Sequence, residues 1–247
     1  MSLSDYRLAL VTGASRGIGA ETVRMLTRRG LEVHATSRAP DTLEALALET
    51  GCRVHALQIA DRAAVAAAFS DIQVDVLVNN AAAPGTPAPL HATDESTFDD
   101  LLAANLKGPC NLLAAVVPGM IARGRGHIVN IGSVAGSWVI PGMPAYAVTK
   151  AALHHLCSIL RLDLHGSGVR VSEIVPGRVR TGIHLDMMAD RHEAERRFYQ
   201  GYSCLEPEDV ASAIAFVLDA PQRMDVTLME ILPTDQSLGG GQYLKRG

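Results

Sequence analysis

Residues 7–30 read "RLALVTGASRGIGAETVRMLTRRG" and predict the start of the fold. An apolar run at 8–11 is typical of a buried strand, and the segment after residue 17 has helical periodicity up to Gly30. Between them lies "TGASRGIG", in which Gly13, Gly17 and Gly19 permit a tight turn and bring a phosphate close to the backbone. The N-terminus of the following helix would offer free N–H groups to that phosphate. The glycines can also serve the turn geometry alone.

Six further short apolar runs alternate with helix-period segments along the rest of the chain. These runs are continuous rather than alternating, which is typical of strands buried on both faces of a parallel sheet. They are "LEVHATS", "RVHALQI", "VDVLVNN", "GHIVNIGS", "GVRVSEIVPG" and "DVTLMEILP". The alternation predicts an α/β, Rossmann-like doubly wound sheet of about seven mostly parallel strands, with helices on both faces. Because no linker or repeat interrupts it, we expect a single domain over residues 1–247.

The composition excludes several classes of protein. Of the 247 residues, 48% are hydrophobic and 19% are charged, and the formal net charge is −4, so a large core is expected and a nucleic-acid partner is not. The start lacks a signal-peptide pattern, and we expect no membrane-spanning segment and a cytoplasmic location. The four scattered cysteines and nine histidines lack metal-site spacing, so no metal is expected.

The end of the second predicted strand indicates which dinucleotide binds. Cofactors without a ribose phosphate are usually held by an acidic residue there, but this chain has Ser37 followed by Arg38. Ser37 can donate to a 2′-phosphate and Arg38 can pair with it, while Arg16 in the glycine-rich turn can approach from the other side. Both arginines can also be ordinary surface residues. The missing acid favours NADP.

The stretch "PAYAVTKAAL" places Tyr146 and Lys150 four residues apart, on one face of a predicted helix. Such a pair is either a surface Tyr over a surface Lys or an ammonium that makes a phenol a better acid. Ser133 ends a predicted buried strand and Asn105 lies in a preceding long helix. We expect these groups to converge at the carboxyl edge of the sheet.

In these motifs the chain resembles the short-chain dehydrogenases/reductases of about 250 residues. The matching elements are "TGASRGIG", "NNAA", Asn105, Ser133, "YAVTK" and "PGRVRT", in the expected order. The resemblance implies that Tyr146 is the general acid and base, and that Lys150 lowers its pKa and holds the nicotinamide ribose. It implies that Ser133 binds the substrate oxygen and that Asn105 holds a water linking Lys150 to solvent.

The same resemblance implies a set of cofactor-binding residues. "NNAA" would pass beneath the adenosine half of the cofactor, and "PGRVRT" would contact the nicotinamide carboxamide. Two positions depart from the family pattern: Ala82 stands where Gly is common, and Gln58 where Asp is common. The full set is Gly13, Ser15, Arg16, Gly17, Ile18, Gly19, Ser37, Arg38, Gln58, Ile59, Asn79, Ala81, Tyr146, Lys150, Pro176, Gly177, Val179 and Thr181.

Residues 177–205 are richer in charge and Met than their surroundings and are expected to form a substrate lid, or else an ordinary surface excursion. Their arginines and His184 could meet a carboxylate or be solvated. The segment "MEILPTDQ" resembles an NADP-dependent subgroup of 3-hydroxy acid and serine dehydrogenases and aldehyde reductases. The implied function is hydride transfer between NADP(H) and a small carbonyl or alcohol substrate, by a homotetramer or homodimer. A non-catalytic dinucleotide-binding regulator, or a structural protein, is the alternative.

Overall fold

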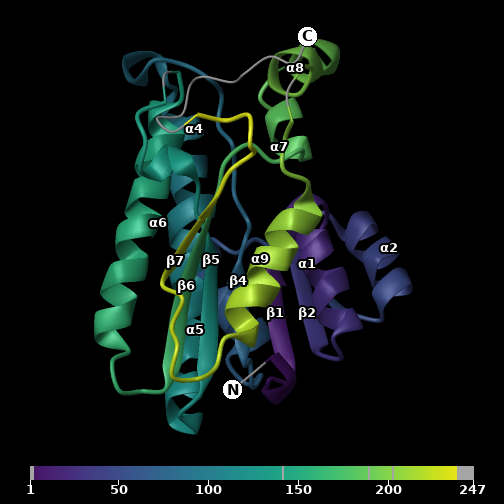
Figure 1. Ribbon diagram of the computed structural model, residues 1–247, viewed down its shortest axis with the longest axis vertical. Coiled ribbons are helices and arrows are strands. Elements are labelled where there is room, and N and C mark those ends of the chain that lie inside the picture. The colour runs from purple at the N-terminus through teal and green to yellow at the C-terminus, as the bar shows by residue number, and fades with distance from the viewer. Residues whose placement is uncertain (1–2, 141, 189, 202, 238–247) are drawn as a thin grey trace.

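The computed structural model describes residues 3–140, 142–188, 190–201 and 203–237. Their framework is a seven-stranded sheet in the order β3-β2-β1-β4-β5-β6-β7, in which every pairing is parallel. The Rossmann-like doubly wound sheet predicted from the sequence is therefore confirmed (Figure 1). The strands are β1 (Leu8–Thr12), β2 (Glu32–Ser37), β3 (Arg53–Ala56), β4 (Val76–Asn79), β5 (Gly126–Ile131), β6 (Val169–Pro176) and β7 (Leu228–Ile231).

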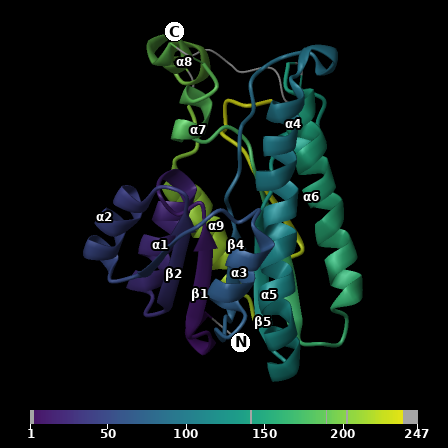
Figure 2. The same ribbon diagram turned by 180° about the vertical axis from the view of Figure 1, so that it is seen from behind.

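Helices cover both faces of this sheet. Because neighbouring residues of a strand point to opposite faces, each strand contributes side chains to both helical layers. Val76 and Val78 of β4 pack in one core with α1 (Gly17–Arg28), α2 (Pro40–Thr50) and α9 (Pro207–Asp219). Leu77, between them, packs in the other core with α3 (Arg62–Phe69), α5 (Gly108–Arg123) and α6 (Pro144–Asp163). Figures 1 and 2 show these two layers from opposite sides. Both faces of the sheet being covered explains the continuous apolar runs.

The long helical segment expected before β5 is divided. It consists of α4 (Glu95–Leu102), a π-helical turn over Ala103–Lys107, and α5. Pro109 contributes to this irregularity, since it has no N–H to donate to the carbonyl of Asn105 four residues earlier. The π turn thus lies where the sequence places a candidate functional residue.

One helical run bears on the expectation that the chain has no membrane-spanning segment. By length and composition alone, the helical run Glu95–Arg123 is long and apolar enough to cross a membrane. Core helices often pass the same test, and here Leu112, Val116 and Met120 pack against the sheet and α3. In the structure this run is one layer of the fold.

The predicted lid forms two short helices beyond the sheet, α7 (Gly182–Leu185) and α8 (Arg191–Phe198) (Figure 1). Its two ends are joined by a parallel bridge between Val179 and Leu205. Above this base, Met187, Ala194, Phe198 and Tyr199 form a small apolar core of their own. The segment is therefore a compact unit whose two ends meet at its base.

Replacing Leu77 by Ala tests the core beneath the site. Leu77 is fully buried in the central strand β4, so the variant should lose about 2–5 kcal/mol of unfolding free energy. Leu48→Ala is the matched control, because Leu48 is 91% exposed and its truncation should change stability by less than about 0.5 kcal/mol. Urea denaturation measures both, and equal losses would contradict the assignment of Leu77 to the core.

Candidate active site

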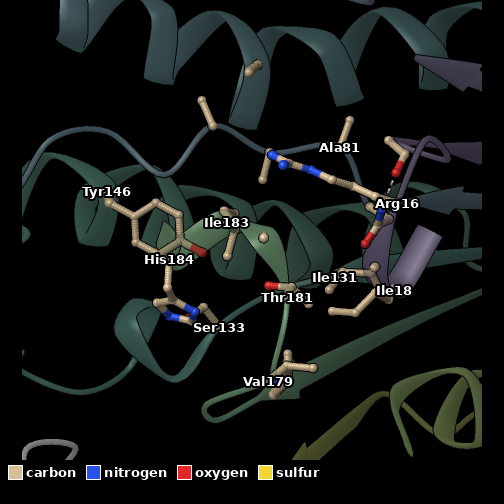
Figure 3. A pocket seen from close by; sticks show the side chains of 18 of the residues that line it. Arg16, Ile18, Ala81, Ile131, Ser133, Tyr146, Val179, Thr181, Ile183 and His184 are labelled. Carbon is tan, nitrogen blue, oxygen red and sulfur yellow. Dashed lines mark hydrogen bonds between the residues drawn. The ribbon is translucent and has the colours of Figure 1, made fainter. Parts of the chain in front are cut away.

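A cavity of about 820 Å³ lies at the carboxyl ends of the strands and extends under the lid. The turn after β1, the ends of β2, β4, β5 and β6, the start of α6, and α7 all contribute to its wall. In open parallel sheets this edge is where ligands bind, since the connecting loops diverge there. Figure 3 shows part of the lining, with Arg16 and Ile18 from the glycine-rich turn and Tyr146, Ser133 and His184 elsewhere in the wall.

The glycine-rich turn between β1 and α1 leaves no room for side chains at two of its positions. Gly13 has a φ of 64°, and a Cβ on it would lie 2.8 Å from the Cα of Ala81. A Cβ on Gly19 would lie 2.3 Å from the carbonyl oxygen of Gly13. The Asn80 side-chain amide donates to the carbonyls of Thr12 and Gly13 and so fixes the turn. The N-terminus of α1 is therefore open to a phosphate, which fits a dinucleotide.

The end of β2 carries no carboxylate toward the cavity. Ser37 and Arg38 both line it, as predicted. Arg16 lines it too, but its guanidinium forms an ion pair with Asp186, which follows α7. A 2′-phosphate, which the sequence predicts as a partner of Arg16, would therefore compete with Asp186 for this guanidinium. Arg16 instead joins the glycine-rich turn to the lid in this structure.

The structure buries Asn79 and places the next residue, Asn80, in the cavity wall. Asn79 is buried in the sheet, where its amide donates to the side-chain oxygen of Asn130, and it does not line the cavity. Asn80, from the same "NNAA" stretch, lines the cavity, and so do Ala81, Gln58 and Ile59. The reason is the alternation of side chains at a strand end.

Ser133 follows β5 and begins a short 3₁₀ turn over Val134–Gly136. Its hydroxyl oxygen accepts from the backbone N–H of Ala135, which leaves the hydroxyl hydrogen available. That hydroxyl acts on the phenol of Tyr146 so as to lower the pKa of the phenol. Two hydroxyl groups thus lie on the cavity wall, one from the end of a strand and one from the first turn of α6.

Burial nevertheless raises the pKa of Tyr146 to about 12. The expected lowering by Lys150 is not found, because the ammonium is held elsewhere. Lys150 Nζ lies 5.8 Å from the centroid of the Tyr146 ring and donates at 2.8 Å to the carbonyl oxygen of Ile131, at the end of β5. The protein alone thus keeps the phenol protonated at neutral pH.

Lys150 is itself buried, and burial lowers its pKa to about 8, while the negative charge of Glu173 acts in the opposite direction. The Glu173 carboxylate lies in β6, where a Cβ on Gly132 would meet it at 2.3 Å. Its other oxygen is 2.7 Å from Nδ1 of the partly exposed His154. Glu173 was not expected from the sequence, because nothing in a strand pattern distinguishes a buried carboxylate beneath a site.

Asn105 does not line the cavity either. Its side-chain oxygen accepts from the N–H of Ala83, and its amide donates to the carbonyl of Ala83 and to the hydroxyl of Thr149. The side chain therefore clamps the loop after β4 to α6. Both of its N–H groups are used in this way. Its role in holding a water stays a prediction, and such a water would have to donate to the side-chain oxygen.

The segment after β6 meets the cavity as predicted. Pro176, Gly177, Val179 and Thr181 all line it. Gly177 is required for packing, since a Cβ there would lie 2.3 Å from the side-chain oxygen of Gln236. That same oxygen accepts from the backbone N–H of Arg178, and Gln236 lies in the cavity wall.

The remaining predicted residues divide in the same way. Ser15, Gly17 and Ile18 line the cavity with Gly13, whereas Gly19 does not and acts through the packing of the turn. Among the basic residues of the lid, Arg178 and His184 line it. Arg180 pairs with Glu195 and Glu206, and the exposed Arg191 pairs with Asp186. Within the described residues, no three His, Cys, Asp or Glu side chains form a group that could hold a metal ion.

Known proteins resemble this chain in sequence and in fold. The family model described as short chain dehydrogenase matches residues 7–192. NADP-dependent 3-hydroxy acid dehydrogenase YdfG of Salmonella typhi is 36% identical over 242 residues, covering 94% of this chain and 97% of that protein. Sulfoacetaldehyde reductase 2 of Chromohalobacter salexigens is 33% identical over 240 residues, covering 93% and 95%.

A solved structure agrees. The closed form of serine dehydrogenase complexed with NADP⁺ superposes with a TM-score of 0.91 at 35% identity, covering 97% of this chain and 100% of that one. The family model spans the sheet from β1 to β6, including the turn, the paired hydroxyls and Lys150 described above. This chain therefore belongs to the short-chain dehydrogenase family.

Proposed function

We propose that this protein is an NADP(H)-dependent oxidoreductase that transfers a hydride between the nicotinamide and a carbonyl or alcohol carbon of a small substrate. The observation that carries the proposal is that one cavity contains both the open glycine-rich turn and the side chains of Ser133 and Tyr146, with Lys150 behind them. Relatives named as NADP-dependent and as bound to NADP⁺ support the choice of cofactor.

The chain's residues have separate tasks in this reaction. The bound dinucleotide supplies or accepts the hydride, and in its oxidised form adds a positive charge beside the phenol. Ser133 donates to the substrate oxygen and stabilises the negative charge that develops there. Tyr146 gives its proton to that oxygen in reduction and takes it back in oxidation. To act as the base in oxidation, the phenol must first be ionised, and because the protein alone raises its pKa to about 12, ionisation near neutral pH would need the added positive charge.

The dinucleotide fits the residues that are present. Gly13, Gly17 and the N-terminus of α1 would hold the pyrophosphate, and Ser37 with Arg38 would meet a 2′-phosphate. Lys150 lines the same cavity and would hold the nicotinamide ribose. We also propose that residues 1–247 form a single domain and that residues 177–205 act as a substrate lid. We propose a cytoplasmic location and a homotetramer or homodimer. Exposed Val148, Ile159 and Leu162 on α6 support a subunit contact there.

A non-catalytic dinucleotide-binding regulator is the less supported alternative, since such a protein would not need the paired hydroxyls. Tyr146→Phe separates the two functions. It should lower kcat by roughly 10²–10⁴-fold, because general acid catalysis is removed, while NADPH binding followed by nucleotide fluorescence persists. Unchanged turnover with retained binding would refute the proton-donor role, and a wild type that binds NADPH but turns over no carbonyl would favour the regulator.

Charge at the end of β2 should set the choice of cofactor. Arg38→Asp combined with Arg16→Ala should reduce the NADPH/NADH ratio of kcat/KM by roughly a hundredfold or more, since each charge-assisted bond to the 2′-phosphate contributes about 1.5–3 kcal/mol. Arg38→Asp alone separates its effect from that of Arg16, which also pairs with Asp186. Arg29→Ala, an exposed arginine paired with Asp219, is the control. An unchanged ratio in the double variant would remove this explanation of cofactor choice.

Glu173 should set the alkaline limit of the reaction. Lys150 acts as a cation, so its contribution is lost as pH rises through its pKa, which lies at about 8 with Glu173 present. Glu173→Gln removes a negative charge that raises this pKa, so the alkaline limb of the kcat/KM profile should move to lower pH. Cys157 and Tyr146 on α6, and His154 beside Glu173, are unchanged. Glu230→Gln, an exposed carboxylate on the neighbouring β7, should leave the limb in place; identical profiles for both variants would contradict the role of Glu173.

A further inference from the structure

The lid contributes one imidazole to the cavity, that of His184 in α7. Its ring packs against the rings of Phe198 and Tyr199, with centroid distances of 5.3 and 5.6 Å. Two aromatic contacts at different angles hold the imidazole plane in one orientation. Figure 3 draws His184 with Tyr146 and Ser133, away from Arg16 and Ile18. The imidazole therefore belongs to the part of the cavity where a substrate, rather than the adenosine half of a cofactor, would lie.

The hydrogen bonds of Tyr199 determine which ring nitrogen of His184 carries the proton. The Tyr199 hydroxyl donates its one hydrogen to the carbonyl oxygen of Thr181, because a carbonyl oxygen can only accept. The same hydroxyl oxygen lies 2.8 Å from Nδ1 of His184, so it must accept there. Nδ1 is consequently the protonated nitrogen, and in the neutral ring Nε2 has a free lone pair.

The imidazole is also kept neutral. Burial, together with the positive charge of Arg178, lowers the pKa of His184 to about 4. Within the described part of the chain, Nε2 makes no hydrogen bond and is not among the buried polar atoms that lack a partner. It is therefore an accessible acceptor.

Part of the wall beside this acceptor is apolar, although Arg178 also lines the cavity and its charge acts on the imidazole. Met143, Ile183 and Met187 line the cavity with His184, and Met187 is buried in the small core of the lid. An acceptor in such surroundings is best satisfied by a donor on the ligand, because leaving it unpaired after water is displaced is unfavourable. A carboxylate or sulfonate oxygen placed against Nε2 would instead bring two lone pairs together.

From this geometry we propose that His184 selects substrates with a hydrogen-bond donor, a hydroxyl or ammonium group, close to the reacting carbonyl or alcohol carbon. The inference rests on the proposed function, since it assumes that Ser133 and Tyr146 hold the reacting oxygen. It assigns to the lid a role in recognition, whereby Tyr199 fixes the tautomer of the recognising residue. An acidic group elsewhere on the substrate is compatible with this arrangement.

Matched substrates provide the test. Hydroxyacetone and 2-butanone differ by one hydroxyl in place of one methyl, as do glycolaldehyde and propanal. With NADPH and the wild-type protein, kcat/KM should favour the hydroxylated member of each pair by roughly tenfold or more, the factor that one hydrogen bond can supply. Equal values, or a preference for the apolar member, would overturn the proposal. If none of the four carbonyl compounds oxidises NADPH, the proposed function fails first, and the two failures are thus distinguished.

Three variants of His184 show whether the acceptor is responsible. His184→Gln can place an amide oxygen where Nε2 lies, and should keep the preference. His184→Asn reaches only the position of Nδ1, and His184→Phe has no acceptor. Both variants should therefore reduce the preference to near unity, by lowering kcat/KM for the hydroxylated substrate and leaving kcat/KM for the apolar substrate unchanged. Tyr199→Phe frees Nδ1 and should weaken the preference with His184 present. NADPH affinity, measured for each variant, should match the wild type. A preference that survives in both His184→Asn and His184→Phe, or that is lost equally in His184→Gln, would overturn the role of His184.

Discussion

The hydrogen bond from the buried Lys150 ammonium to the carbonyl of Ile131 is the contact on which the site depends. It ties α6 to the end of β5 and places Tyr146, one turn earlier, beside Ser133. Close packing supports it, since a Cβ on Gly136 would lie 2.8 Å from the Lys150 backbone. A buried charge without partners is unfavourable, so the carbonyl and the nearby Glu173 together allow the cation to remain there.

This arrangement leaves the chemistry incomplete until the cofactor binds. The protein alone raises the pKa of Tyr146, because burial outweighs the effect of the Ser133 hydroxyl and because Lys150 is directed at a carbonyl. On the function proposed above, the positive charge that favours the phenolate arrives with the oxidised dinucleotide. Proton transfer would then be efficient only in the loaded site, which couples the acid–base chemistry to cofactor occupancy.

The lid is connected to the site at more than one place. Arg16 pairs with Asp186 across the cavity mouth, His184 and Met187 reach its wall, and Tyr199 bonds to the backbone of Thr181. Each contact joins a residue after β6 to a part of the chain that a dinucleotide or substrate would also touch. Binding at the cavity and the position of α7 are therefore linked energetically, since a 2′-phosphate and Asp186 would compete for the same guanidinium.

The sequence by itself determined the parallel sheet, the glycine-rich turn and the placing of Tyr146 and Lys150 one turn apart on a helix, because apolar runs, glycine spacing and a four-residue interval are local patterns. Tertiary structure alone decided that Asn80 rather than Asn79 reaches the cavity, that Asn105 lies in a π turn, and that Glu173 lies beneath Lys150. It also decided the tautomer of His184. These features arise from contacts between residues distant in the chain, and which way a side chain points at a strand end depends on register and packing that no local pattern encodes.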